Sequence, residues 1–101
     1  MVTARHRPLP GPSHCERAID HVVVIMQPEI DRNPMMKDRG PLLRDAAVQG
    51  CIETAWSDES LDCYDQSIDV SSLRPCFHKL TDVQRDDFNQ RITDILKQPI
   101  P

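Results

Sequence analysis

The sequence predicts an all-α fold, a compact array of four to five short helices stapled by two disulfides. Apolar residues recur at helical spacing in several segments, and no segment alternates with period two over enough length to form a strand. Serine and threonine residues that suit helix N-caps precede the apolar segments. Four cysteines occur in only 101 residues, and small exported domains often use disulfides where the core is thin.

The composition indicates one small domain preceded by an N-terminal segment of different composition. Hydrophobic residues make up 39% of the chain and aromatic residues 4%, so the core is small and aliphatic. Residues 1–12 contain three of the nine prolines and no acidic residue, which predicts a flexible Pro-rich stalk. We expect residues 13–98 to form a single helical, disulfide-linked domain.

The first helix is predicted to begin at Ser13, which forms a capping box with Glu16. Pro28 disfavours the helical conformation of the residue before it, so we expect the helix to end there. We expect residues 27–40 to form a polar connection that holds one helical turn. The apolar face of the first helix consists of Cys15, Ala18, Ile19, Val22, Val23 and Met26.

The second helix is predicted to start at Pro41, because the missing N–H of proline costs nothing at the first helical position. Ser57 ends this helix and caps a third one, and Trp56 and Leu61 flank that cap as a hydrophobic staple. Gly50 weakens the second helix and lets another backbone come close. The residues of the third helix expected to face inward are Leu61, Tyr64 and Ile68.

Two more helices complete the predicted domain. A short one covers the segment SSLRPC at residues 71–76. Thr81 and Gln84 form a second capping box, which opens the last helix, and Pro99 ends it. The apolar stripe of the last helix consists of Phe88, Ile92, Ile95 and Leu96.

Four cysteines allow three pairings. If the first two helices pack antiparallel, Cys15 at the start of one lies beside Cys51 near the end of the other. Cys63 and Cys76 then remain for each other. We therefore predict the disulfides Cys15–Cys51 and Cys63–Cys76. The alternative is a metal site with His14 or His78 as a nitrogen ligand, but zinc sites usually show close cysteine pairs such as C-x2-C, which this sequence lacks.

Four carboxylates spaced four, three and four residues apart are predicted to lie on one helical face, which we call the acidic edge: Asp58, Asp62, Asp65 and Asp69. Such an edge can steer a basic protein partner, or it is an ordinary solvated face. Arg5 and Arg7 give residues 1–12 a charge of +2, so the net charge of −4 leaves −6 on the remainder. A nucleic-acid partner is therefore not expected.

No motif in the sequence indicates catalysis. The chain has no G-x-S-x-G elbow and only three glycines, so it lacks a phosphate-binding glycine-rich loop. We expect no enzymatic activity, no metal and no cofactor. Met26, Met35 and Met36 either fill the core or form an adaptable apolar binding surface.

The cysteines and the N-terminus point to different compartments. The longest apolar run, Val22 to Met26, is far shorter than the ~20 residues that span a bilayer, so we expect no transmembrane segment. The start of the chain is basic but has no apolar region of a signal peptide. Either the protein is cytosolic with free thiols or its natural leader is missing. We favour the missing leader and an extracytoplasmic location, periplasmic or secreted.

The order of several residues resembles that of a known type of protein. These residues are Cys15, Asp20-His21, Met26, Cys51, Trp56, Cys63, Leu73 and Cys76. Over roughly residues 14–80 the chain resembles short predicted exported or lipid-anchored bacterial four-cysteine helical proteins. The resemblance implies export, disulfides and helices, and it assigns no ligand.

These observations predict a non-catalytic extracytoplasmic protein-interaction module. The alternative is a cytosolic metal-binding protein that uses cysteine thiolates and a histidine.

Overall fold

The computed structural model describes residues 13–98, which form five α-helices and no strand. The predicted all-α fold with two disulfides is confirmed. The stalk predicted at residues 1–12 lies outside the described residues. The helices are α1 (His14–Arg32), α2 (Pro34–Glu53), α3 (Asp58–Asp65), α4 (Val70–His78) and α5 (Asp82–Lys97).

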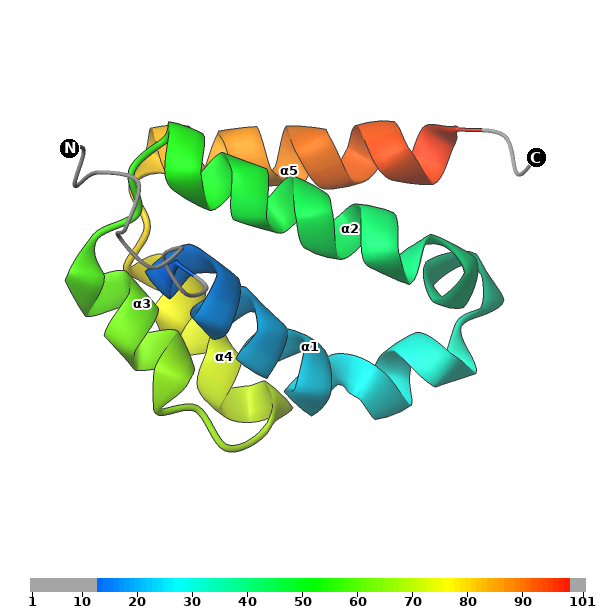
Figure 1. Ribbon diagram of the computed structural model, residues 1–101, viewed down its shortest axis with the longest axis horizontal. Coiled ribbons are helices and arrows are strands. Elements are labelled where there is room, and N and C mark those ends of the chain that lie inside the picture. The colour runs from blue at the N-terminus through cyan, green and yellow to red at the C-terminus, as the bar shows by residue number, and fades with distance from the viewer. Residues whose placement is uncertain (1–12, 99–101) are drawn as a thin grey trace, which may run out of the picture.

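The helices α1 and α2 run in opposite directions and form the frame of the domain (Figure 1). α5 lies along α2, while α3 and α4 pack against α1. His21 of α1 donates a hydrogen bond from its Nε2 to the carbonyl of Ser67 (2.7 Å), which joins α1 to the loop between α3 and α4. Within residues 13–98, none of the helices is long and apolar enough to cross a bilayer.

Both predicted disulfides are present. Cys15 and Cys51 have their Cα atoms 5.9 Å apart, and Cys63 and Cys76 have theirs 5.5 Å apart, which are ordinary distances for a disulfide. The first bond joins the start of α1 to the end of α2, as the antiparallel arrangement predicted. The second bond joins α3 to α4.

The predicted helix caps form as the sequence indicated. The hydroxyl of Ser13 accepts the N–H of Glu16 (3.1 Å), and the hydroxyl of Thr81 accepts the N–H of Gln84 (3.1 Å). The side chains of Glu16 and Gln84 reach back to the cap backbone, so both capping boxes are complete. Ser57 caps α3, and its hydroxyl accepts the N–H of the third helical residue.

The predicted connection at residues 27–40 is wrong, because Asn33 alone separates the first two helices. Asn33 ends α1, and its side chain accepts the N–H groups of Met35 (3.1 Å) and Met36 (3.4 Å), which caps α2. Pro34 takes the first position of α2, where its missing N–H has no helical partner to lose.

Pro28 and Pro41, which were expected at helix boundaries, lie inside α1 and α2. The last turn of α1 has local support, because Arg32 pairs with Glu29 and donates to the carbonyl of Pro28 (3.2 Å). Gly40 has no Cβ to clash with the ring of Pro41, so the chain remains helical there. Figure 1 shows α2 changing direction near its start.

A few aromatic residues pack together within a mainly aliphatic core. Trp56 stacks on Tyr64 with ring centroids 5.9 Å apart, and Phe88 lies 6.1 Å from Trp56. Tyr64 is buried as predicted, but the inward position predicted for Ile68 is wrong, since that residue is 85% exposed. α3 ends at Asp65, so helical spacing no longer sets the direction of Ile68.

A glycine allows α5 to pack closely on α2. A Cβ atom at Gly50 would lie 2.9 Å from Oδ2 of Asp87 and 3.2 Å from Cδ of Arg91. Arg91 donates to Asp87 (2.8 Å) and to Glu53 of α2 (2.6 Å). The close approach predicted for Gly50 is therefore made by the side chains of α5.

A buried arginine of α2 holds the other end of α5. Arg39 is 7% exposed, and its Nε donates to the carbonyl of Ile95 (3.1 Å). Another nitrogen of the same guanidinium donates to the carbonyl of Gln98. Carbonyls at a helix C-terminus lack helical partners and carry partial negative charge, so Arg39 satisfies and stabilises the end of α5.

Candidate functional site

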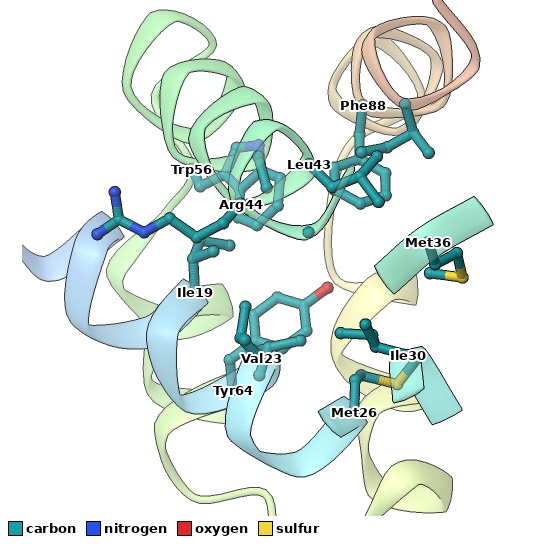
Figure 2. Close-up of a pocket in the computed structure, with 14 residues that line it drawn as sticks. Ile19, Val23, Met26, Ile30, Met36, Leu43, Arg44, Trp56, Tyr64 and Phe88 are labelled. Atoms are coloured by element: carbon teal, nitrogen blue, oxygen red, sulfur yellow. The ribbon is translucent and has the colours of Figure 1, made fainter. Parts of the chain in front are cut away.

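An apolar cavity of about 270 Å³ lies between the helices of the frame and α5 (Figure 2). Its walls come from α1, α2 and α5, and from two aromatic residues, Trp56 just before α3 and Tyr64 near the end of α3. The side chains that line it include Ile19, Val22, Val23, Met26 and Ile30 of α1, Met36, Leu43 and Ala47 of α2, Phe88 and Ile92 of α5, and Trp56 and Tyr64.

The cavity results from the way α1 and α2 are joined. The Cys15–Cys51 disulfide ties them at one end and Asn33 at the other. Near the disulfide the lining is closely packed, with Ile19 only 5% exposed. Toward Asn33, the lining residues Met26 and Met36 are partly exposed. The cavity is therefore closed at the disulfide end and reaches solvent at the Asn33 end.

One polar group points into this apolar space. Tyr64 is 6% exposed, and its hydroxyl is directed into the cavity (Figure 2). The hydroxyl forms no hydrogen bond with any of the described residues. Burial raises the pKa of Tyr64 to about 12, so the phenol is neutral and can donate a hydrogen bond at physiological pH.

The other aromatic residue of the wall also carries an unpaired donor. Trp56 is 7% exposed, and its indole N–H is buried without a hydrogen-bond partner in the described part of the chain. A buried tryptophan N–H usually has a partner. The atom is fully covered, in contrast to the Tyr64 hydroxyl, so it does not line the open space. Trp56 is the only tryptophan, which makes it a specific optical reporter of the cavity.

Arg44 stands at the rim of the cavity, but its charge lies outside. The guanidinium points away from the cavity (Figure 2) and donates to Asp20 (2.8 and 3.1 Å) and Asp45 (3.1 Å). These hydrogen bonds raise the pKa of Arg44 and lower the pKa of Asp20. Since every other lining side chain is apolar or aromatic, the interior of the cavity holds no charged group.

The structure brings three residues of the predicted acidic edge together around a histidine. His14 Nε2 lies 2.8 Å from Asp65 and 3.5 Å from Asp62, and its Nδ1 lies 3.5 Å from Asp58. The hydrogen bond to Asp65 is the main cause of a raised His14 pKa. When protonated, the imidazole partly neutralises this surface.

The fourth carboxylate of the acidic edge lies on a different element. α3 ends at Asp65, and Asp69 is the N-cap of α4, so the prediction of one helical face is wrong for Asp69. Its side chain accepts hydrogen bonds from Ser71 (2.9 Å) and from the N–H of Ser72 (2.9 Å), which lower the pKa of Asp69. Binding of a basic partner to the acidic edge stays a prediction.

Metal ligation has one candidate group among residues 13–98. The ligand atoms of His14, Asp62 and Asp65 lie within 4.8 Å of one another. The contacts of His14 with the two carboxylates account for this arrangement without a metal ion. All four cysteines are in disulfides, which disfavours the cytosolic metal-binding alternative, because no thiolate is left as a ligand.

The sequence indicated parts of the cavity but not the cavity itself. It predicted that Tyr64 faces inward and that Met26, Met35 and Met36 belong to the core or to an apolar binding surface. Tyr64, Met26 and Met36 line the cavity, whereas Met35 is 49% exposed and does not. The signal was the helical spacing of these residues. The unpaired Tyr64 hydroxyl had no sequence signal, because its surroundings depend on how the helices diverge.

Comparison of the chain with protein-family models, with curated proteins and with solved structures finds no match.

Proposed function

We propose that this protein is a non-catalytic binding domain of the extracytoplasmic space, periplasmic or secreted, that takes up a small apolar molecule. The observation that carries the proposal is the cavity of about 270 Å³ between α1, α2 and α5. A cavity of about 150 Å³ with apolar walls holds benzene. The present cavity therefore has room for a larger molecule of the same character.

The chemistry of the walls supports this kind of ligand. Apart from Arg44, the side chains that line the cavity are apolar or aromatic, so the space suits an apolar ligand. A ligand that replaces water against these walls gains roughly 25 cal/mol for each Å² of apolar surface buried. The two disulfides fit an oxidising compartment, which supports the proposed location.

A titration with isopropylbenzene, which does not emit in the range of tryptophan, followed by the fluorescence of Trp56, tests the proposal. We expect a saturable change in emission, because Trp56 lines the cavity and is the only tryptophan. The substitution Val23→Phe places a large side chain in the cavity wall and should weaken binding at least tenfold. Val24→Phe is the matched control, since Val24 is the next residue of α1 and is 70% exposed.

Far-UV circular dichroism must show that both variants keep the helical content of the wild type. A wild-type titration without saturation refutes the proposal, as does equal binding by the Val23→Phe variant and the wild type. A loss of binding that is the same in both variants also refutes it, because Val24 lies outside the cavity.

A second candidate function is capture of a basic protein at the acidic edge, favoured by the exposure of its outer carboxylates. The side chains of Asp58 and Asp62 remain 92% and 59% exposed although both lie near His14. A polylysine peptide is a suitable probe. Replacing Asp58 and Asp62 by Asn should reduce its binding at low salt more than replacing Asp86 and Asp94, which are exposed carboxylates of α5. Equal effects of the two double variants would show that the edge is an ordinary solvated face.

A further inference from the structure

The proposed ligand site contains one group that can choose between ligands, the hydroxyl of Tyr64. The residue is 6% exposed, and its hydroxyl points toward the part of the cavity lined by Met26, Ile30 and Met36 (Figure 2). None of these three side chains carries a strong hydrogen-bond acceptor. The hydroxyl has no partner among residues 13–98, although buried tyrosine hydroxyls usually have one.

The unpaired hydroxyl disfavours ligands that are purely apolar. In the free protein, water that enters from the Asn33 end can hydrogen-bond to the hydroxyl. A hydrocarbon that displaces this water leaves the donor buried and unsatisfied, which is costly. A ligand with an acceptor at the same place replaces the hydrogen bond of the water and avoids this loss.

The lack of internal charge disfavours ligands that are ionised. Burying a carboxylate or an ammonium group without a partner is strongly unfavourable. Arg44 is the charged residue of the lining, and its guanidinium is turned outward and held by Asp20 and Asp45. A fatty carboxylate would therefore find no cation inside the cavity.

We infer that the ligand is a neutral, mainly apolar molecule with one carbonyl oxygen, a ketone, aldehyde or ester, which accepts a hydrogen bond from the Tyr64 hydroxyl. Scaling from the benzene-sized cavity gives room for about ten carbon atoms. The inference rests on the proposed function and specifies its ligand class.

Three probes of nearly equal size separate the ligand classes: acetophenone, which has a carbonyl, isopropylbenzene, which has none, and benzoate, which is charged. Their dissociation constants are measured by isothermal titration calorimetry at pH 7 for the wild type and for the Tyr64→Phe variant. We expect Tyr64→Phe to weaken acetophenone binding about tenfold, the usual effect of losing one such hydrogen bond. Isopropylbenzene should bind the variant as tightly as the wild type or more tightly, and benzoate should bind neither measurably.

The substitution is expected to leave the free protein folded, because it removes a hydroxyl that has no partner. Urea unfolding of Tyr64→Phe at the wild-type midpoint or above it checks this expectation. Equal changes for acetophenone and isopropylbenzene would overturn the hydrogen-bond inference while leaving the proposed function intact. Tighter binding of benzoate than of acetophenone would overturn the neutral class. Failure of both neutral probes to bind the wild type would instead refute the proposed function itself.

Discussion

The two disulfides should contribute unequally to stability, because they close loops of different length. The Cys15–Cys51 bond spans a sequence separation of 36 residues, and the Cys63–Cys76 bond spans 13. When loop-closure entropy dominates, removing them lowers the free energy of unfolding by about 4 and about 3 kcal/mol, respectively, at 25 °C. Small domains have a total stability of roughly 5–15 kcal/mol, so either loss is a large part of the whole.

Two double alanine variants, one for each disulfide, test this expectation. One cysteine of each pair, Cys51 and Cys76, is fully buried, so the packing lost at that position is similar in the two variants. Urea unfolding followed by circular dichroism at 222 nm gives the free energies. The intact mass of the wild type, measured without reductant, should lie four hydrogens below that of the reduced wild-type chain. A larger loss for the Cys63–Cys76 variant than for the Cys15–Cys51 variant would refute the loop-closure reasoning.

Three further predictions concern single residues. Because the carboxylate of Asp65 raises the pKa of His14, the folded state holds the His14 proton more tightly than the unfolded state does. This stabilisation is complete below the unfolded pKa of about 6.5 and is lost as the pH rises through the pKa of the folded state. Between pH 6 and pH 8 the free energy of unfolding should therefore fall more for the wild type than for His14→Gln. Gly50→Leu should lower the free energy of unfolding by about 1–3 kcal/mol, because the added side chain collides with Asp87 of α5, and an unchanged urea midpoint would contradict the close packing. Arg39→Met should cost about 1.5–3 kcal/mol, since the last carbonyls of α5 lose a charged donor, and amide exchange should accelerate in that turn first.

Features that depend on neighbouring residues could be predicted from the sequence. The capping boxes at Ser13 and Thr81 involve residues three positions apart, so their pattern contains the whole interaction. The pairing of Cys15 with Cys51 followed from one assumption, that consecutive helices pack antiparallel. The inward position of Tyr64 followed from helical periodicity.

Features that depend on tertiary structure could not be predicted from the sequence. The local preference of proline was a misleading guide at Pro28 and Pro41, where the surrounding helix continues. Asp69 kept the spacing of a helical face but lies beyond the end of α3, where it caps the next helix. The cavity depends on the divergence of α1 and α2 and on the absence of any described segment between them, and neither is a property of local sequence.

The two ties between α1 and α2 have a mechanical consequence. The backbone from Cys15 to Cys51, together with the disulfide, forms a closed covalent ring, and most of the residues that line the cavity belong to this ring. In such a ring neither helix can slide along the other, and the two helices cannot separate at the disulfide end. With both ends joined, the space between the helices can widen only if α1 and α2 bow apart between Asn33 and the disulfide. A ligand of the proposed site would then enter and leave while both ends stay joined and the paired helices keep their register.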